Sequence, residues 1–144
     1  MMEKANPIVP SQAGDLGSFL DGYVECALWS SLDNDAIEGR VDRQGENLDD
    51  NFGPDDIHPD TLGAMTADCV SFMRANAADL ALYYEATGCN EGSAGHDFWL
   101  TRHHHGAGFW DRGAGEVGDR LTKAAETYGS FDLWANDDGV IQHN

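Results

Sequence analysis

The sequence predicts a single α+β domain of two layers, in which three helices pack on a small antiparallel sheet of two hairpins, in the order α-α-β-β-α-β-β. Three observations favour this class. Apolar residues recur at helical spacing in three segments, bulky residues alternate around glycine-containing turns in two others, and 144 residues suit one domain. Residues 1–13, which hold two prolines, are expected to form a flexible N-terminal arm, leaving residues 14–144 as the domain.

The first predicted helix covers about residues 15–31. Apolar side chains recur every three or four residues from Leu16 to Leu28, and Asp15 is placed to cap the helix. The segment 33–58 has no such periodicity. It holds three glycines, one proline and nine acidic residues, so we expect an ordered or semi-ordered acidic loop there.

A long second helix is expected from Pro59 to Thr87. Proline suits the first position of a helix, and one apolar face continues along the whole segment until Gly88. A third helix is expected at about 115–128, where apolar residues again share one side and Gly129 ends the helix.

Two hairpins are predicted in the C-terminal half. The first joins HDFWLTR to GFWDR within residues 96–112, because bulky residues alternate in both parts and glycines lie between them. The second is FDLWANDDGVIQH, residues 131–143, where Asp138 and Gly139 form a favoured two-residue turn. Two hairpins can pair into one small sheet on which the helices pack.

The charge of the chain limits its partners. Twenty-six acidic residues against eight basic ones give a net charge of −18 and a pI near 4.2. Such a field repels nucleic acid and anionic membrane surfaces, so direct nucleic-acid binding and membrane association are not expected. A partner attracted by charge should be basic. No apolar run is long enough for a secretion signal or a membrane span, which predicts a cytoplasmic protein.

The cysteines agree with a reduced, cytosolic setting. Cys26, Cys69 and Cys89 include no CxxC pair, which argues against a disulfide framework and against a thiolate zinc site. Cys26 and Cys69 fall on apolar helix faces, so we expect small buried hydrophobic side chains there.

The stretch GHDFWLTRHHHGAGFWDRG, residues 95–113, concentrates chemically active side chains. On a strand, His103 and His105 share a face, and with Asp97 or Asp111 across the hairpin they are the candidate ligands of a zinc or nickel ion. The alternative is an exposed histidine cluster at a turn, which binds added metal without being built for it.

The same stretch holds candidates for acid–base catalysis. A general acid and base pair requires titratable groups within hydrogen-bond reach of the reacting atom. The candidate residues are His96, Asp97, Arg102, His105, Asp111 and Arg112. These side chains can equally form a structural network, through an Arg102–Asp111 or an Asp97–Arg112 pair. The structural interpretation is favoured because no nucleophile elbow, phosphate loop or HExxH spacing accompanies them, and no cofactor is predicted.

The pattern GHDFWLTRxxHGAGFWDRG, followed by a helix and a hairpin with an Asp-Asp-Gly turn, resembles a family of small proteins encoded by bacteriophages and related mobile elements. LWSS at 28–31, LDDNFG at 48–53 and DDIHPDT at 55–61 resemble it too, and the similarity spans about residues 20–143. His103 and His104 depart from the small or polar residues expected there. The resemblance implies a bacterial host cell as the setting and no particular activity. The matched positions within the motif are His96, Asp97, Phe98, Trp99, Thr101, Arg102, His105, Gly106, Gly108, Phe109, Trp110, Asp111 and Arg112.

These observations favour a phage accessory protein that binds a basic host protein. Its carboxylates would imitate DNA phosphates and occupy the basic groove of a nucleic-acid-binding defence or repair enzyme, such as a CRISPR-type nuclease complex, a restriction enzyme or a uracil-DNA glycosylase. The alternatives are a small enzyme or metal-binding protein that uses the His/Asp/Arg stretch, and an oligomerisation or regulatory module. The candidate partner-binding carboxylates are Asp33, Asp35, Glu38, Asp42, Glu46, Asp49, Asp50, Asp55, Asp56, Asp68, Asp79 and Glu85.

Overall fold

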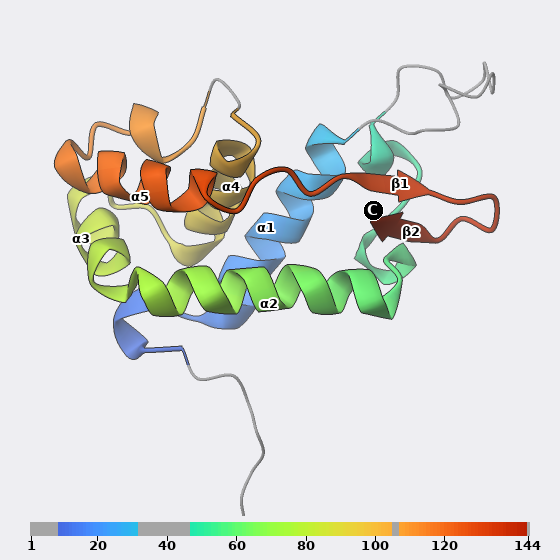
Figure 1. Ribbon diagram of the computed structural model, residues 1–144, viewed down its shortest axis with the longest axis horizontal. Coiled ribbons are helices and arrows are strands. Elements are labelled where there is room, and N and C mark those ends of the chain that lie inside the picture. Colours follow the sequence, from blue (N-terminus) through green and yellow to red (C-terminus); the bar gives the residue numbers. More distant parts are fainter. Residues whose placement is uncertain (1–8, 32–46, 105–106, 144) are drawn as a thin grey trace, which may run out of the picture.

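The computed structural model describes residues 9–31, 47–104 and 107–143. Within these residues the fold consists of five α-helices, short 3-10 turns and one two-stranded antiparallel sheet (Figure 1). The prediction of three helices packed on a sheet of two hairpins is therefore wrong. The elements are α1 Leu16–Ser30, α2 Pro59–Ala75, α3 Ala77–Thr87, α4 Glu91–Arg102, α5 Glu116–Glu126, β1 Leu133–Ala135 and β2 Ile141–His143, with 3-10 turns η1 Ser11–Ala13, η4 Leu48–Asp50, η5 Pro54–Asp56 and η6 Phe109–Asp111.

The first predicted hairpin is replaced by helix α4 and turn η6. Asn90 caps α4, because its side chain accepts a hydrogen bond from the Ser93 backbone N–H at 2.9 Å. Phe98 and Trp99 are both buried, although they lie on different sides of the helix. A helix that is enclosed on nearly all sides shows no amphipathic period, and this is why its bulky residues resemble an alternating strand.

The long helix predicted from Pro59 is broken at Asn76. Asn76 has non-helical dihedrals (φ −121°, ψ 26°), and its side chain donates to the Phe72 carbonyl oxygen at 2.9 Å. The Leu80 N–H donates a hydrogen bond to the Asn76 carbonyl oxygen in the first turn of α3. The apolar faces of α2 and α3 meet the same core, so the pattern of apolar residues continues across the break and does not reveal it.

Helices α1 and α4 cross closely at the centre of the molecule. Gly22 and Gly95 are both buried at this crossing. A Cβ added at Gly95 would lie 2.8 Å from the Tyr23 backbone nitrogen and nearer still to the Phe19 carbonyl oxygen. The two backbones are therefore in contact, and this crossing tolerates no side chain.

Aromatic rings fill the core beside this crossing. The rings of Phe72 on α2 and Phe98 on α4 stack with their centroids 4.2 Å apart. Phe109 of η6 also stacks on Phe72, with ring centroids 5.6 Å apart. Tyr23 of α1 meets Phe98 at 5.2 Å. The rings thus join α1, α2, α4 and η6 into one core.

The second predicted hairpin forms from β1 and β2, with Trp134 opposite Gln142. Its turn is longer than the expected Asp138-Gly139 pair. Asn136 begins the turn, its side chain accepts from the Asp138 and Val140 N–H groups, and Gly139 takes the positive φ of 79° that ends it.

The C-terminal hairpin also fastens the described part of the acidic loop. Ile57 forms a bridge with Ile141 of β2, and the His58 N–H donates to the Ile141 carbonyl at 2.8 Å. In Figure 1 the hairpin and the η4–η5 segment lie together at the end of the molecule where α2 begins. Residues 33–46 of the predicted loop lie outside the described residues.

Residues 9–13 are the described part of the predicted N-terminal arm. Ala13 is buried, and its carbonyl accepts a hydrogen bond from the Tyr84 hydroxyl at 2.6 Å. Across the described part of the chain, none of the helices is both long enough and apolar enough to cross a membrane.

Candidate functional site

The stretch that looked most like an active site folds into a buried network. Asp97 is completely buried and accepts from the Tyr83 hydroxyl at 2.6 Å. Arg112 donates to the same carboxylate through Nη2 at 2.8 Å and Nε at 3.3 Å. These hydrogen bonds raise the pKa of Arg112 above its ordinary value. The Asp97–Arg112 pair considered from the sequence therefore forms, but it connects α4 to the residue after η6 and does not cross a hairpin.

Arg102 is the centre of a second hydrogen-bond network and is only 3% exposed. Its guanidinium donates to Asp68 Oδ2 at 2.8 Å and to the Tyr23 hydroxyl at 2.8 Å. Two further hydrogen bonds reach the carbonyl oxygens of Gly129 at 2.6 Å and Tyr128 at 3.0 Å. The alternative Arg102–Asp111 pair is not formed. Arg102 thus joins α4 to α1, α2 and the chain after α5.

His103 is held by the backbone on both sides of its ring. Its Nδ1 lies 2.7 Å from the Trp99 carbonyl oxygen, and its Nε2 accepts from the Phe131 N–H at 3.0 Å. Burial lowers the pKa of His103 below its ordinary value. Both ring nitrogens are engaged, so His103 has no lone pair available for a metal, and the second weak candidate ligand, His105, lies outside the described residues. Within the described ranges, no group of three or more His, Cys, Asp or Glu side chains could hold a metal ion.

Acidification should destabilise the protein partly through His103. Because burial keeps the folded pKa low, the unfolded chain binds a proton near its ordinary pKa of 6.5 and the folded chain does not. This part of the stability is complete above that pH and is lost as the pH falls toward the folded pKa. We expect His103→Gln to lose less stability than the parent protein between about pH 7.5 and about pH 5, measured by urea unfolding. Equal losses in the two proteins would contradict the assignment.

Cys26 and Cys69 are buried, and we expect a structural role for both side chains. Burial raises the pKa of the Cys26 thiol to about 12 and that of Cys69 well above its ordinary value. The thiolate is the nucleophile, so neither side chain is reactive at neutral pH.

Of the other candidate residues, His96 and Arg112 line one polar cavity. This cavity has a volume of about 390 Å³ and lies beside the first turns of α4, with Ser93 on its wall. His96 Nε2 lies 3.8 Å from Glu25 Oε1 of α1. Asp111 is directed elsewhere, because it accepts from the Gly108 N–H at 3.1 Å and closes η6. The five candidates within the described residues are therefore not brought together into one site, and His105 lies outside those residues.

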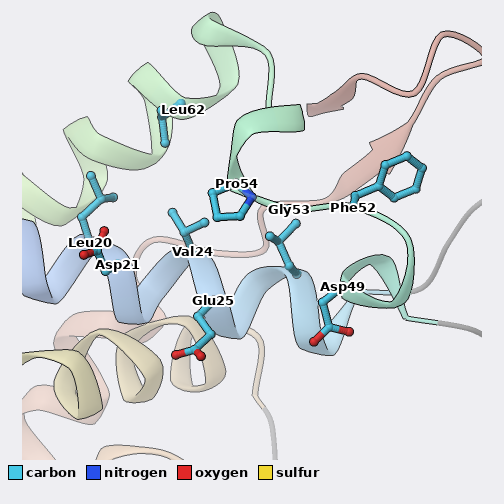
Figure 2. A pocket seen from close by; sticks show the side chains of 10 residues that line it. Leu20, Asp21, Val24, Glu25, Asp49, Phe52, Gly53, Pro54 and Leu62 are labelled. Atoms are coloured by element: carbon cyan, nitrogen blue, oxygen red, sulfur yellow. The ribbon is translucent and has the colours of Figure 1, made fainter.

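A larger groove lies between α1, the η4–η5 segment and the start of α2 (Figure 2). Its volume is about 570 Å³. Leu20, Val24 and Leu28 of α1 form one wall, at the four-residue spacing of a single helix row. The opposite side is lined by Phe52, Gly53 and Pro54, and by Leu62 of α2.

Three carboxylates border this apolar groove. Asp21 and Glu25 lie on α1, Asp49 lies on η4, and all three are exposed. Among the described residues, the ten that line the groove include no lysine, arginine or histidine. The groove therefore combines an apolar surface with negative charge and offers no internal counter-charge.

The predicted partner-binding carboxylates have several different environments. Asp68 and Asp79 are paired with arginines, Asp68 with Arg102 and Asp79 with Arg120 at 2.8 Å. Asp50 and Asp56 accept from the backbone N–H groups of Asn47 and Gly53, at 2.9 and 2.8 Å. Asp49, Asp55 and Glu85 are exposed, and Asp49 borders the groove. Asp33, Asp35, Glu38, Asp42 and Glu46 lie outside the described residues.

Sequence reasoning did not find the α1 side of the groove. Asp21 and Glu25 are spaced by four residues beside the row Leu20, Val24 and Leu28, and this arrangement was visible in the sequence. The apolar row was assigned to the core because nothing local shows that the neighbouring chain leaves it partly open.

No family model, curated protein or solved structure matches this chain. The resemblance to phage proteins therefore stays a prediction from the sequence.

Proposed function

We propose that this chain is a binding protein whose groove receives a basic, amphipathic segment of a partner protein. The observation that carries the proposal is the groove itself, whose apolar walls are bordered by Asp21, Glu25 and Asp49 with no basic side chain among the lining residues. The apolar side chains of such a segment would bury themselves between α1 and α2, and its lysines or arginines would face the carboxylates.

The overall charge supports the same kind of partner. A net charge of −18 attracts a basic protein over a long range and accelerates the encounter. Local contacts in the groove then discriminate between basic partners, because only a segment with correctly spaced apolar residues fills it.

The sequence resemblance favours a bacterial host cell as the setting, and the acidity of the chain favours a nucleic-acid-binding enzyme as the partner. Recognition by the groove changes which carboxylates the DNA-mimic hypothesis can use. Arginines already neutralise Asp68 and Asp79, so these carboxylates are poor substitutes for phosphates. We therefore propose that the protein binds a basic surface segment of an enzyme such as a nuclease complex, a restriction enzyme or a DNA glycosylase, with Asp21, Glu25 and Asp49 as the main contacts.

A synthetic peptide tests the proposal. The probe is a fluorescein-labelled helical peptide with leucines on one face and lysines on the other, measured by fluorescence anisotropy. We expect the double variant Asp21→Asn/Asp49→Asn to bind this peptide about tenfold more weakly, since two charges beside the groove are removed. A peptide in which serines replace the leucines should also bind more weakly.

The control variant Glu116→Gln/Asp119→Asn removes the same charge from two exposed positions on α5. It should retain nearly all of the affinity. If the two double variants weaken binding equally, attraction is only long-range and groove recognition is wrong.

A further inference from the structure

An exposed tryptophan lies beside the groove, on the adjacent row of α1. Asp21, Glu25 and Trp29 follow one another at four-residue spacing, next to the row that lines the groove. The Trp29 side chain is 50% exposed, which is unusual for the largest apolar side chain. Exposed tryptophans are enriched where proteins bind one another.

The surroundings of Trp29 combine an aromatic surface with a carboxylate. The Trp29 ring lies 6.4 Å from the His96 ring between centroids, and His96 Nε2 lies 3.8 Å from Glu25 Oε1. Figure 2 shows the Glu25 side chain on the side of α1 away from Pro54. Glu25 lines both the groove and the polar cavity beside α4, so it connects the groove to the Trp29 side of the helix.

We propose that Trp29 and Glu25 form a subsite for an arginine side chain of the partner segment. The inference rests on the proposed function, because it names the chemistry recognised beside the groove. A guanidinium stacks on an indole face through a cation–π contact and pairs with a carboxylate through its planar fork of N–H groups. An ammonium group forms the point-charge contact only, so the subsite prefers arginine to lysine.

The charged groups around the subsite favour a cation. Asp21 and Glu25 are negative and exposed, and both lie on α1. Arg112 also lines the cavity next to Glu25, but two hydrogen bonds from its guanidinium bind it to the buried Asp97 carboxylate. That ion pair contributes little net charge. His96, whose Nε2 lies 3.8 Å from Glu25 Oε1, is positive only when it is protonated, so its neutral form leaves the acidic residues dominant.

Trp110 is a matched internal control. Its side chain is 51% exposed, almost the same as that of Trp29. The neighbouring carboxylate of Asp111 is occupied by the Gly108 N–H, and Arg112 follows it in the chain. Trp110 therefore has the same exposure, but the carboxylate next to it in the chain already accepts a backbone hydrogen bond.

The test is a titration with Nα-acetyl-arginine amide, followed through the indole N–H signals of the ¹⁵N-labelled protein. The indole signal that is missing from the spectrum of Trp29→Phe belongs to Trp29. The chemical shift of this signal should change with ligand concentration and reach a plateau, whereas that of Trp110 should stay nearly constant. The citrulline analogue, which keeps the shape and lacks the charge, should cause no shift, and Glu25→Gln should weaken binding about threefold to tenfold. Equal shifts of the two tryptophans, or none, would overturn the proposal.

A second peptide distinguishes failure of the subsite from failure of the groove. It is the leucine/lysine peptide with every lysine replaced by arginine. We expect Trp29→Leu to weaken binding of the arginine peptide more than binding of the lysine peptide. If Trp29→Leu binds both like the parent protein while Asp21→Asn/Asp49→Asn weakens them, the subsite is wrong and the groove stands. If only Trp29→Leu and Glu25→Gln weaken binding, the groove is wrong and the subsite stands.

Discussion

Replacing Arg102 with methionine should lower the free energy of unfolding by about 3–5 kcal/mol, because it removes one member of a buried ion pair. Methionine has a similar length but no N–H groups. The carbonyl oxygens of Tyr128 and Gly129 would lose their donors, and Asp68 would lose its partner. These hydrogen bonds are partly shielded from water, so each acceptor left without its donor adds to the cost.

Urea unfolding followed by tryptophan fluorescence measures this loss. Arg120→Met is the matched control, since Arg120 pairs with Asp79 on the surface, where its side chain is 49% exposed. That change should cost clearly less. Arg102→Lys should recover only part of the stability, because an ammonium cannot reproduce the fork that reaches four acceptors. Similar losses for Arg102→Met and Arg120→Met would contradict the role assigned to Arg102.

Replacing Gly95 with alanine should cost about 3 kcal/mol, at the upper end of what overpacking a core usually costs. The added methyl group would overlap the Phe19 carbonyl oxygen, so α1 and α4 would have to separate along their whole crossing. The aromatic rings packed beside the crossing would then lose contact as well.

Gly63→Ala is the matched control for this change. Gly63 also lies inside a helix, α2, but a Cβ at this position would meet no atom within 4 Å. Alanine there should stabilise the protein by about 0.5–1 kcal/mol, because glycine loses more backbone entropy on folding. Denaturation midpoints of the two variants should therefore move in opposite directions, and a neutral Gly95→Ala would show that the helices are not in backbone contact.

The amphipathic helices and the second hairpin were predictable from the sequence. Helix α1 runs from Leu16 to Ser30, close to the expected 15–31, and Asp15 caps it by accepting from the Ser18 N–H at 2.9 Å. Helix α5 and the hairpin also lie at the expected positions. These elements have one face in the core and one in solvent, so apolar residues recur along the sequence with the period of the secondary structure.

Helix α4 and the break between α2 and α3 escaped prediction for physical reasons. The residues of α4 are buried on several sides, and two of them, Asp97 and Arg102, are polar groups satisfied by partners distant in the chain. A pattern of apolar and polar residues cannot distinguish such buried polar groups from exposed ones. The break at Asn76 depends on one side-chain hydrogen bond to the backbone, and the apolar pattern passes over it.

The candidate site was only partly predictable. The acidic character of residues 47–58 followed from composition, and the proposal of a basic partner rests on the same charge. The groove requires Leu20 and Leu62 to face each other across a gap, and these residues are brought together by tertiary packing alone. Chemical richness in residues 95–113 was a poor guide, because most of those side chains stabilise the core.

The bridge between Ile57 and Ile141 has a consequence for biosynthesis. During translation, Asp49 and Pro54 leave the ribosome long before β2, so the η4–η5 segment can meet α1 early, but its bridge to the hairpin can form only after β2 has emerged. Contacts between residues so far apart in sequence form slowly compared with local helices. The nascent chain should therefore acquire its helices first and the hairpin contact beside the η4–η5 segment last.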